Sequence, residues 1–150
     1  MFSKACEYGI RACLFIAKSS LTNERVALAT IAEAINSPEA FTAKILQKLV
    51  RNNIIHSIKG PGGGFEISKE KMEQTPLKDV VVAIDGNELF VGCAMGLKSC
   101  DAKQPCPLHE EFSSIRKSLN NLLDYSSILS LALTLENGET FLKRLNETTN

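Results

Sequence analysis

The sequence lacks a long hydrophobic run, a net charge and an internal repeat. No apolar stretch of this 150-residue chain reaches the roughly 20 residues that a membrane-spanning helix requires. We therefore expect no secretory leader, no membrane partner and a cytoplasmic protein. The 17 Lys and Arg residues are balanced by 17 Asp and Glu residues. This balance argues against a tail that coats nucleic acid indiscriminately, but it leaves room for a local basic surface.

Composition and length are those of an ordinary globular chain. Hydrophobic residues make up 44% and charged residues 23%, and 150 residues suffice for one small domain with an extension. The charge is divided unevenly, since residues 1–75 carry ten basic and seven acidic side chains and residues 76–150 reverse that ratio. A polyanion would therefore meet the first half.

The first half predicts three helices followed by a β-hairpin. Apolar residues recur at helical spacing over 3–19 and 28–35, and Ser37-Pro38-Glu39 is typical of a helix start for a third helix ending near residue 52. Ser37 is expected to cap that helix. Strands are expected at 54–58 and 65–67, on either side of a glycine-rich turn. This order is that of a winged helix-turn-helix, which places its third helix in the major groove of DNA.

In the second half we expect a connector, an irregular segment and several further helices. Residues 69–75 are expected to be a polar connector, and 76–84 a helix. Residues 87–106 look irregular, and Pro107 is expected to open a long helix ending near residue 124. Two short helices are expected at 127–135 and 139–145, with a frayed tail at 146–150. The fold class is thus mainly α with a small β-hairpin wing, divided into a DNA-binding domain at 1–75 and a sensor and dimerisation region at 76–150. The long helix carries a short coiled-coil seam at Leu108, Phe112, Ile115, Leu119 and Leu122.

Two basic features precede the connector. Lys44, Gln47, Lys48 and Arg51 share one face of the third predicted helix. On its own this pattern is more typical of a solvated surface, but its position ahead of a wing favours a DNA-binding face. The turn that begins with Lys59-Gly60 matches no phosphate-binding loop, because no Lys-Ser or Lys-Thr pair follows its glycines. It is either a plain hairpin turn or a wing whose glycines let the backbone approach a phosphate.

Three of the five cysteines form a possible ligand set. Six residues separate Cys93 from Cys100, five separate Cys100 from Cys106, and two separate Cys106 from His109. An odd number of cysteines disfavours a disulfide framework. Structural zinc sites prefer tighter spacings, whereas wide gaps suit a loop wrapped around an iron–sulfur cluster. The alternative is three incidental loop cysteines beside a histidine at a helix start.

Several motifs resemble the Rrf2 family of bacterial transcription regulators over residues 1 to about 135. They are Tyr8-Gly9-x-Arg11-Ala12, the runs at 37–41 and 45–49, and the Gly-Pro-Gly-Gly-Gly turn with its flanking Lys59 and Phe65. The resemblance implies a symmetric homodimer with a long dimerisation helix and an iron–sulfur cluster in the cysteine loop. A two-iron two-sulfur cluster is favoured over a four-iron four-sulfur cluster. The implied ligands are Cys93, Cys100 and Cys106, with His109 favoured over Glu7 as the fourth.

The combined hypothesis is a non-enzymatic DNA-binding transcription regulator that senses iron–sulfur status, redox state or nitric oxide. Its partner would be a near-palindromic double-stranded operator, with the two recognition helices about 34 Å apart. The DNA contacts are expected at Ser37, Phe41, Thr42, Lys44, Lys48, Lys59 and Gly60. One alternative is a cluster-free regulator that responds to thiol oxidation or to a small metabolite. Another is a small thiol oxidoreductase using Cys100 and Cys106, although the sequence has no Cys-x-x-Cys pair.

Overall fold

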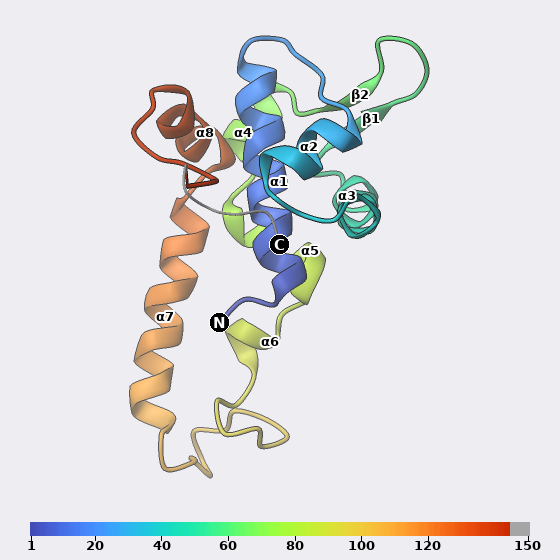
Figure 1. The fold of residues 1–150 in the computed structure, drawn as a ribbon. Helices are drawn as coiled ribbons and strands as arrows, with labels where there is room; N and C mark the ends of the chain where they lie inside the picture. The colour runs from blue at the N-terminus through green and yellow to red at the C-terminus, as the bar shows by residue number, and fades with distance from the viewer. Residues whose placement is uncertain (145–150) are drawn as a thin grey trace.

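The computed structural model describes residues 1–144, which form eight helices and one two-stranded sheet (Figure 1). The predicted fold class, mainly α with a β-hairpin wing, is confirmed. In chain order the elements are α1 (Lys4–Leu21), α2 (Leu28–Ala34), α3 (Glu39–Arg51), β1 (His56–Ile58), β2 (Gly64–Glu66), α4 (Lys69–Gln74), α5 (Leu77–Asp85), α6 (Glu88–Val91), α7 (His109–Tyr125) and α8 (Ile128–Glu136).

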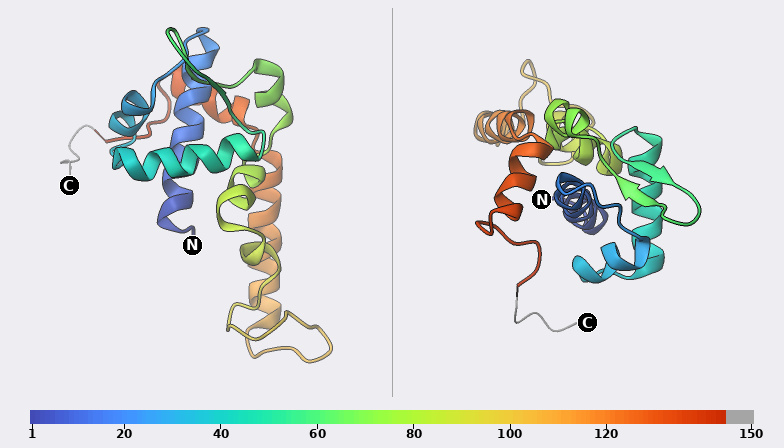
Figure 2. Two further views of the ribbon diagram at one scale, coloured as in Figure 1. Left: turned by 90° about the vertical axis from the view of Figure 1, so that its right-hand side faces the viewer. Right: turned by 90° about the horizontal axis from the view of Figure 1, so that it is seen from above.

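Helix α1 is the centre of the fold. Viewed from above, it lies between α3 and the hairpin on one side and α7 and α8 on the other (Figure 2). Its apolar residues lie on two sides of the helix and are buried or half-buried, and Cys6 and Cys13 are fully inaccessible. Burial raises the pKa of each of these two thiols to about 12, so both act as small core residues. A side chain at Gly9 would overlap Ile84, so the absence of one lets α5 pack closely on α1.

The start of α3 differs from the sequence prediction. The helix begins at Glu39, its N-cap is Pro38, and no side chain caps it. Ser37 was expected to cap, but the Pro38 carbonyl accepts the first helical hydrogen bond, from the Thr42 N–H. The chain turns into this start at Asn36, whose φ of +53° is one that asparagine tolerates better than most residues.

The wing is a short antiparallel hairpin fixed on both sides of its second strand. Ser57 pairs with Phe65 across the hairpin. On the other edge of β2, Val26 and Phe65 exchange two backbone hydrogen bonds of 3.1 and 2.9 Å. The segment before α2 therefore acts as a third, one-residue strand, and the wing is anchored to the helical core.

The second half departs from the prediction in four places. Residues 88–91, within the segment expected to be irregular, form the single-turn helix α6. Residues 69–74 form α4 instead of a plain connector. Helix α7 begins at His109, two residues after the expected Pro107, because the Cys106 carbonyl accepts a turn-like bond from the His109 N–H. Residues 139–144 are not helical, contrary to the helix expected there. Residue 145 and the expected tail at 146–150 lie outside the described residues.

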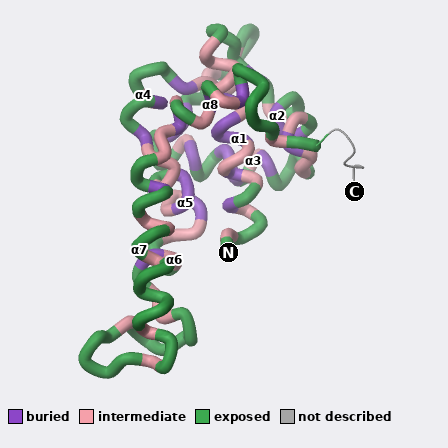
Figure 3. The backbone as a smooth tube through the Cα atoms, turned by 90° about the vertical axis from the view of Figure 1, so that its left-hand side faces the viewer, coloured by how far each residue is buried: buried purple, intermediate pink, exposed green. Residues whose placement is uncertain are grey.

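The wing and the cysteine loop lie at opposite ends of the molecule. Helix α7 runs away from the helical core and carries the loop of residues 92–108 at its far end (Figures 1 and 2). It packs on α5 and buries Leu123, yet most of its length is exposed (Figure 3). Among residues 1–144, no helix has the length and apolar character to cross a membrane.

Candidate nucleic-acid interface and cysteine loop

Helix α3 presents a basic face to solvent. Ile45, Leu46 and Leu49 are buried on one side and hold the helix against the core. The exposed side carries Lys44, Gln47, Lys48 and Arg51. Such a fixed, polar helix surface has the chemistry needed to meet phosphates and base edges.

An aromatic and cationic cluster fixes the first turn of α3. Phe41 is 37% exposed, and its ring meets Tyr8 of α1 edge to face at a centroid distance of 5.8 Å. The Arg11 guanidinium lies 4.8 Å from the centre of the Tyr8 ring and also donates to the Ile35 carbonyl. The segment Tyr8–Arg11 therefore supports the start of α3 from α1.

Ser37 and Thr42 lie together, but only one of them faces solvent. Thr42 is fully buried, and its hydroxyl lies 2.8 Å from both the Ser37 hydroxyl and the Pro38 carbonyl oxygen. Ser37 is half-buried. In this conformation Thr42 cannot touch a ligand outside the domain, and its hydroxyl instead orients Ser37.

The tip of the wing is exposed and shaped by glycine. Lys59 and Gly60 are both exposed, and the Gly63 N–H closes the turn on the Gly60 carbonyl at 2.9 Å. Gly60 adopts a φ of +88°. A side chain at Gly63 would overlap the Ile58 carbonyl, so the backbone needs glycine to turn this tightly.

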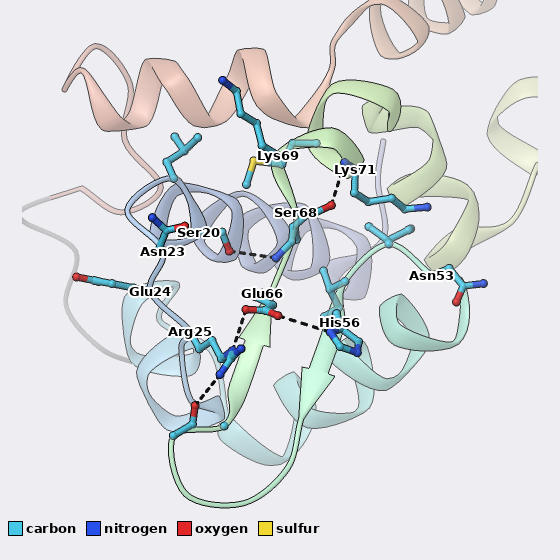
Figure 4. Close-up of a pocket in the computed structure, with 17 residues that line it drawn as sticks. Ser20, Asn23, Glu24, Arg25, Asn53, His56, Glu66, Ser68, Lys69 and Lys71 are labelled. Carbon is cyan, nitrogen blue, oxygen red and sulfur yellow. Dashed lines mark hydrogen bonds and ion pairs between the residues drawn. The ribbon is translucent and has the colours of Figure 1, made fainter.

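Arg25 fixes the base of the wing. Its guanidinium lies 2.8 Å from a Glu66 carboxylate oxygen and also donates to the Gly62 carbonyl, while His56 approaches the other Glu66 oxygen at 3.6 Å (Figure 4). Hydrogen bonding from Arg25 lowers the pKa of Glu66. Sequence reasoning missed this contact because 41 residues separate its partners.

The cysteine loop brings its donors together as two pairs. The Cys100 sulfur lies 3.5 Å from His109 Nδ1 at the start of α7. Cys93 is hydrogen-bonded by Cys106. The backbone N–H groups of Leu97 and Met95 donate hydrogen bonds to the Cys93 sulfur. These bonds are the main reason that the pKa of this thiol is lowered. All four predicted ligands are half-buried.

The four donors do not converge on a single point. Among residues 1–144, no three His, Cys, Asp or Glu side chains gather closely enough to hold one metal ion. Glu7, the other candidate for a fourth ligand, forms an ion pair with Lys4 at 3.3 Å on the exposed start of α1. Within one chain, therefore, His109 lies beside a loop cysteine and Glu7 is engaged elsewhere.

Sequence reasoning missed Arg116 as a member of this site. Its Nη1 lies 3.3 Å from the Cys100 sulfur. A signal was available, since Arg116 follows His109 by seven residues and so lies on the same side of α7, two turns further on.

An apolar stripe runs along α7 next to the side that faces the loop. Ile115 and Leu122 are 59% and 62% exposed. Phe112, one turn before Ile115, is also exposed, and Leu119, between Ile115 and Leu122, is half-buried. These residues belong to the predicted seam, and no other part of residues 1–144 covers it. Large aliphatic side chains repeated on one exposed helix face are typical of a surface that another helix buries.

Comparison with known proteins gives one family match. Residues 2–133 match the model of the Rrf2 family, described as an iron-dependent transcriptional regulator.

Individual relatives agree with that match. A putative HTH-type transcriptional regulator of Aquifex aeolicus is 25% identical over 134 residues, which cover 87% of this chain and 90% of the relative. The regulator IscR of Klebsiella pneumoniae (strain 342) is 26% identical over 117 residues, which cover 78% and 70%. Among solved structures, CymR, the global cysteine regulator of B. subtilis, superposes with a TM-score of 0.70 at 20% identity, over 89% of this chain and 96% of CymR. That likeness shows a shared fold.

Proposed function

Since the chain belongs to the Rrf2 family of transcriptional regulators, we propose that it acts as a cytoplasmic DNA-binding homodimer whose operator affinity is set by an iron–sulfur cluster in the cysteine loop. The observation that carries the proposal is the placement of three cysteines and His109 in one loop, at the end of the helix that bears the exposed seam. The DNA-binding part occupies residues 1–75, and the sensing and pairing part the remainder.

The proposed DNA surface consists of the exposed face of α3 and the wing tip. Ser37 lies just before α3, and Phe41 and Lys44 lie on its N-terminal half, which we place in the major groove. Lys48 follows one turn later. Lys59 and Gly60 meet the backbone or the minor groove. Thr42, being buried, serves this surface by orienting Ser37.

Dimerisation is proposed through the seam on α7. Covering Ile115, Leu122 and their neighbours with the same stripe of a second chain removes apolar surface from water without a new type of partner. A two-fold axis along α7 would present two α3 helices to successive turns of a near-palindromic operator.

The donors of the loop fit an iron–sulfur cluster in kind. Thiolates with one imidazole are a known ligand set for such clusters, and N–H groups directed at a ligand sulfur are among the features that tune them. The two separate donor pairs, Cys93 with Cys106 and Cys100 with His109, suit a group with two iron atoms better than a single ion. A ligand site is rarely fully formed before its metal binds, so closure of the loop is expected to accompany binding.

The bound group would supply a redox-sensitive or nitrosylation-sensitive centre, and this chain's residues would transmit its state. His109 is both a donor and the first residue of α7. A change in ligation at His109 therefore acts directly on the end of the pairing helix, which is the two-state element that could reposition the paired α3 helices.

The deciding experiment is anaerobic purification followed by iron and acid-labile sulfide analysis and an absorption spectrum. We expect a coloured protein with iron and sulfide in equal amounts, and operator binding in gel shifts that changes after exposure to oxidant. A colourless protein that contains neither would refute the cluster. Failure to bind duplex DNA in every state would refute the regulator model as a whole.

A cluster-free thiol switch is the second candidate, because the donors are paired and not gathered at one point. In that case Cys93 and Cys106, already in contact, would form a disulfide when oxidised. Iron-free protein whose DNA binding is reversed by diamide and restored by dithiothreitol would favour it.

A further inference from the structure

Arg116 is a half-buried cation with an unusual neighbour. None of the ion pairs within residues 1–144 involves Arg116. Its Nη1 instead lies 3.3 Å from the Cys100 sulfur. A guanidinium withdrawn from water ordinarily meets a carboxylate or phosphate. Here it meets the sulfur of a proposed cluster ligand. The side chain is therefore poised for a negative charge that the loop acquires later.

Arg116 lies on the side of α7 that faces the cysteine loop. His109, Arg116 and Leu123 are spaced by seven residues, so they follow one another along one side of α7. Leu123 is buried against the core, His109 touches Cys100, and Arg116 lies between them. The exposed seam is the neighbouring stripe, so Arg116 stays on the loop side when α7 pairs.

We propose that Arg116 is a positioning residue that orients the Cys100 sulfur for ligation and raises the reduction potential of the iron–sulfur group bound by the loop. The inference rests on the proposed function. It adds a residue, and a direction of tuning, that the ligand spacing does not contain.

The electrostatic argument gives the sign. When the group in the loop takes up one electron from an external reductant, the ligand set becomes more negative by one charge. A permanent positive charge beside a ligand sulfur stabilises that reduced state more than the oxidised one, and in a partly buried site the effect is only weakly screened. Arg116 itself exchanges neither electron nor proton, because its guanidinium stays protonated at all accessible pH values.

The test is a redox titration of anaerobically prepared full-length protein with dithionite, followed by absorption. The variants are Arg116→Gln, which removes the charge, and Arg116→Lys, which keeps it. Lys117→Gln is the matched control, since this adjacent exposed residue loses the same charge on another side of the helix. Iron, sulfide and circular dichroism are measured for every sample.

We expect Arg116→Gln to shift the ratio of oxidised to reduced protein at least tenfold towards the oxidised form at a fixed potential, which is a midpoint lower by about 59 mV for a one-electron couple. Arg116→Lys should shift it less, and Lys117→Gln should leave it unchanged. Loss of iron from Arg116→Gln alone, with helix content intact, also supports the proposal.

Other outcomes overturn it. Equal midpoints in Arg116→Gln and the parent, at equal iron content, would exclude the tuning role while leaving the cluster hypothesis standing. Equal loss of iron from Arg116→Gln and Arg116→Lys would reduce Arg116 to a packing residue. A parent protein without iron and sulfide refutes the proposed function, and this inference with it.

Discussion

The wing and the cysteine loop are both irregular, glycine-containing segments, but they are held in different ways. The wing is fixed by backbone hydrogen bonds to Val26 and by the Arg25–Glu66 ion pair. The cysteine loop reaches α7 through the Cys100 sulfur, which contacts His109 and Arg116. Backbone bonds persist whatever is bound, whereas sulfur contacts change when the sulfur becomes a ligand. The wing is thus preformed, as the proposed contact with DNA requires, and the loop can change shape with its ligand, as the proposed sensing requires.

The largest expected effect comes from breaking the proposed dimer contact of α7, the helix that carries the cysteine loop. Ile115→Glu places a charge in the proposed seam, where burying it without a partner is costly. We expect a monomer in sedimentation experiments. Operator affinity should fall by about 10²- to 10⁴-fold, because the two half-sites no longer act together.

Asn121→Glu is the matched control for Ile115→Glu. It adds the same charge on an exposed side of α7 away from the seam. It should remain dimeric. If both variants were monomeric, general repulsion would explain the result, and if both were dimeric, the dimer would use another surface.

The next test compares a cysteine of the loop with a cysteine of the core. Cys100→Ser should remove iron and sulfide while leaving the thermal unfolding of the iron-free protein unchanged. Cys13→Ser should retain iron but lower the free energy of unfolding by about 1–3 kcal/mol, because it buries a hydroxyl in an apolar core. Metal analysis and denaturant unfolding measure the two effects. Iron retained in Cys100→Ser would remove this cysteine from the ligand set.

Glycine substitutions compare the rigidity of the two segments more gently. At Gly64 a Cβ would lie 2.8 Å from the Val26 carbonyl oxygen, and φ is +138°. Gly64→Ala should therefore displace the wing, cost about 1–3 kcal/mol of stability and weaken DNA binding. Gly96→Ala, at a φ of +77° in open space, should cost about 1 kcal/mol and leave DNA binding by the iron-free protein unchanged. Equal effects on DNA binding would contradict a preformed wing.

Local patterns predicted most of the helical fold. The two buried stripes of α1, the amphipathic α3 and the hairpin around its glycines follow from spacing and turn chemistry. The predicted Ser37 cap was wrong. The helix begins with the Pro38 carbonyl, and the Ser37 hydroxyl is hydrogen-bonded to the Thr42 hydroxyl instead. The missing helix at 139–144 had only weak periodicity, over a short segment that begins after Gly138.

The parts of the site that the sequence could not predict are long-range contacts. Spacing grouped Cys100 and His109 in one ligand set but did not pair them, and the Cys100 sulfur lies 3.5 Å from His109 Nδ1. Arg25 reaches Glu66 only because Val26 pairs with β2, and that pairing leaves no mark in the local sequence. Burial of Thr42 was foreshadowed by its position in the helical period, since it shares the side of α3 that carries Ile45 and Leu49.

The smallest expected effect distinguishes the two ends by their contact with phosphate. Lys59 lies on the wing and Lys98 on the cysteine loop, and both are exposed. Lys59→Ala should weaken binding to all DNA sequences alike and reduce the slope of log affinity against log salt by about 0.9 for each wing that touches a phosphate. Lys98→Ala removes an equal charge from the far end and should leave the slope as it was. Gel shifts over a range of salt concentrations measure both slopes. Matching slopes in the two variants would mean that net charge alone governs binding, and the wing would then have no direct phosphate contact at Lys59.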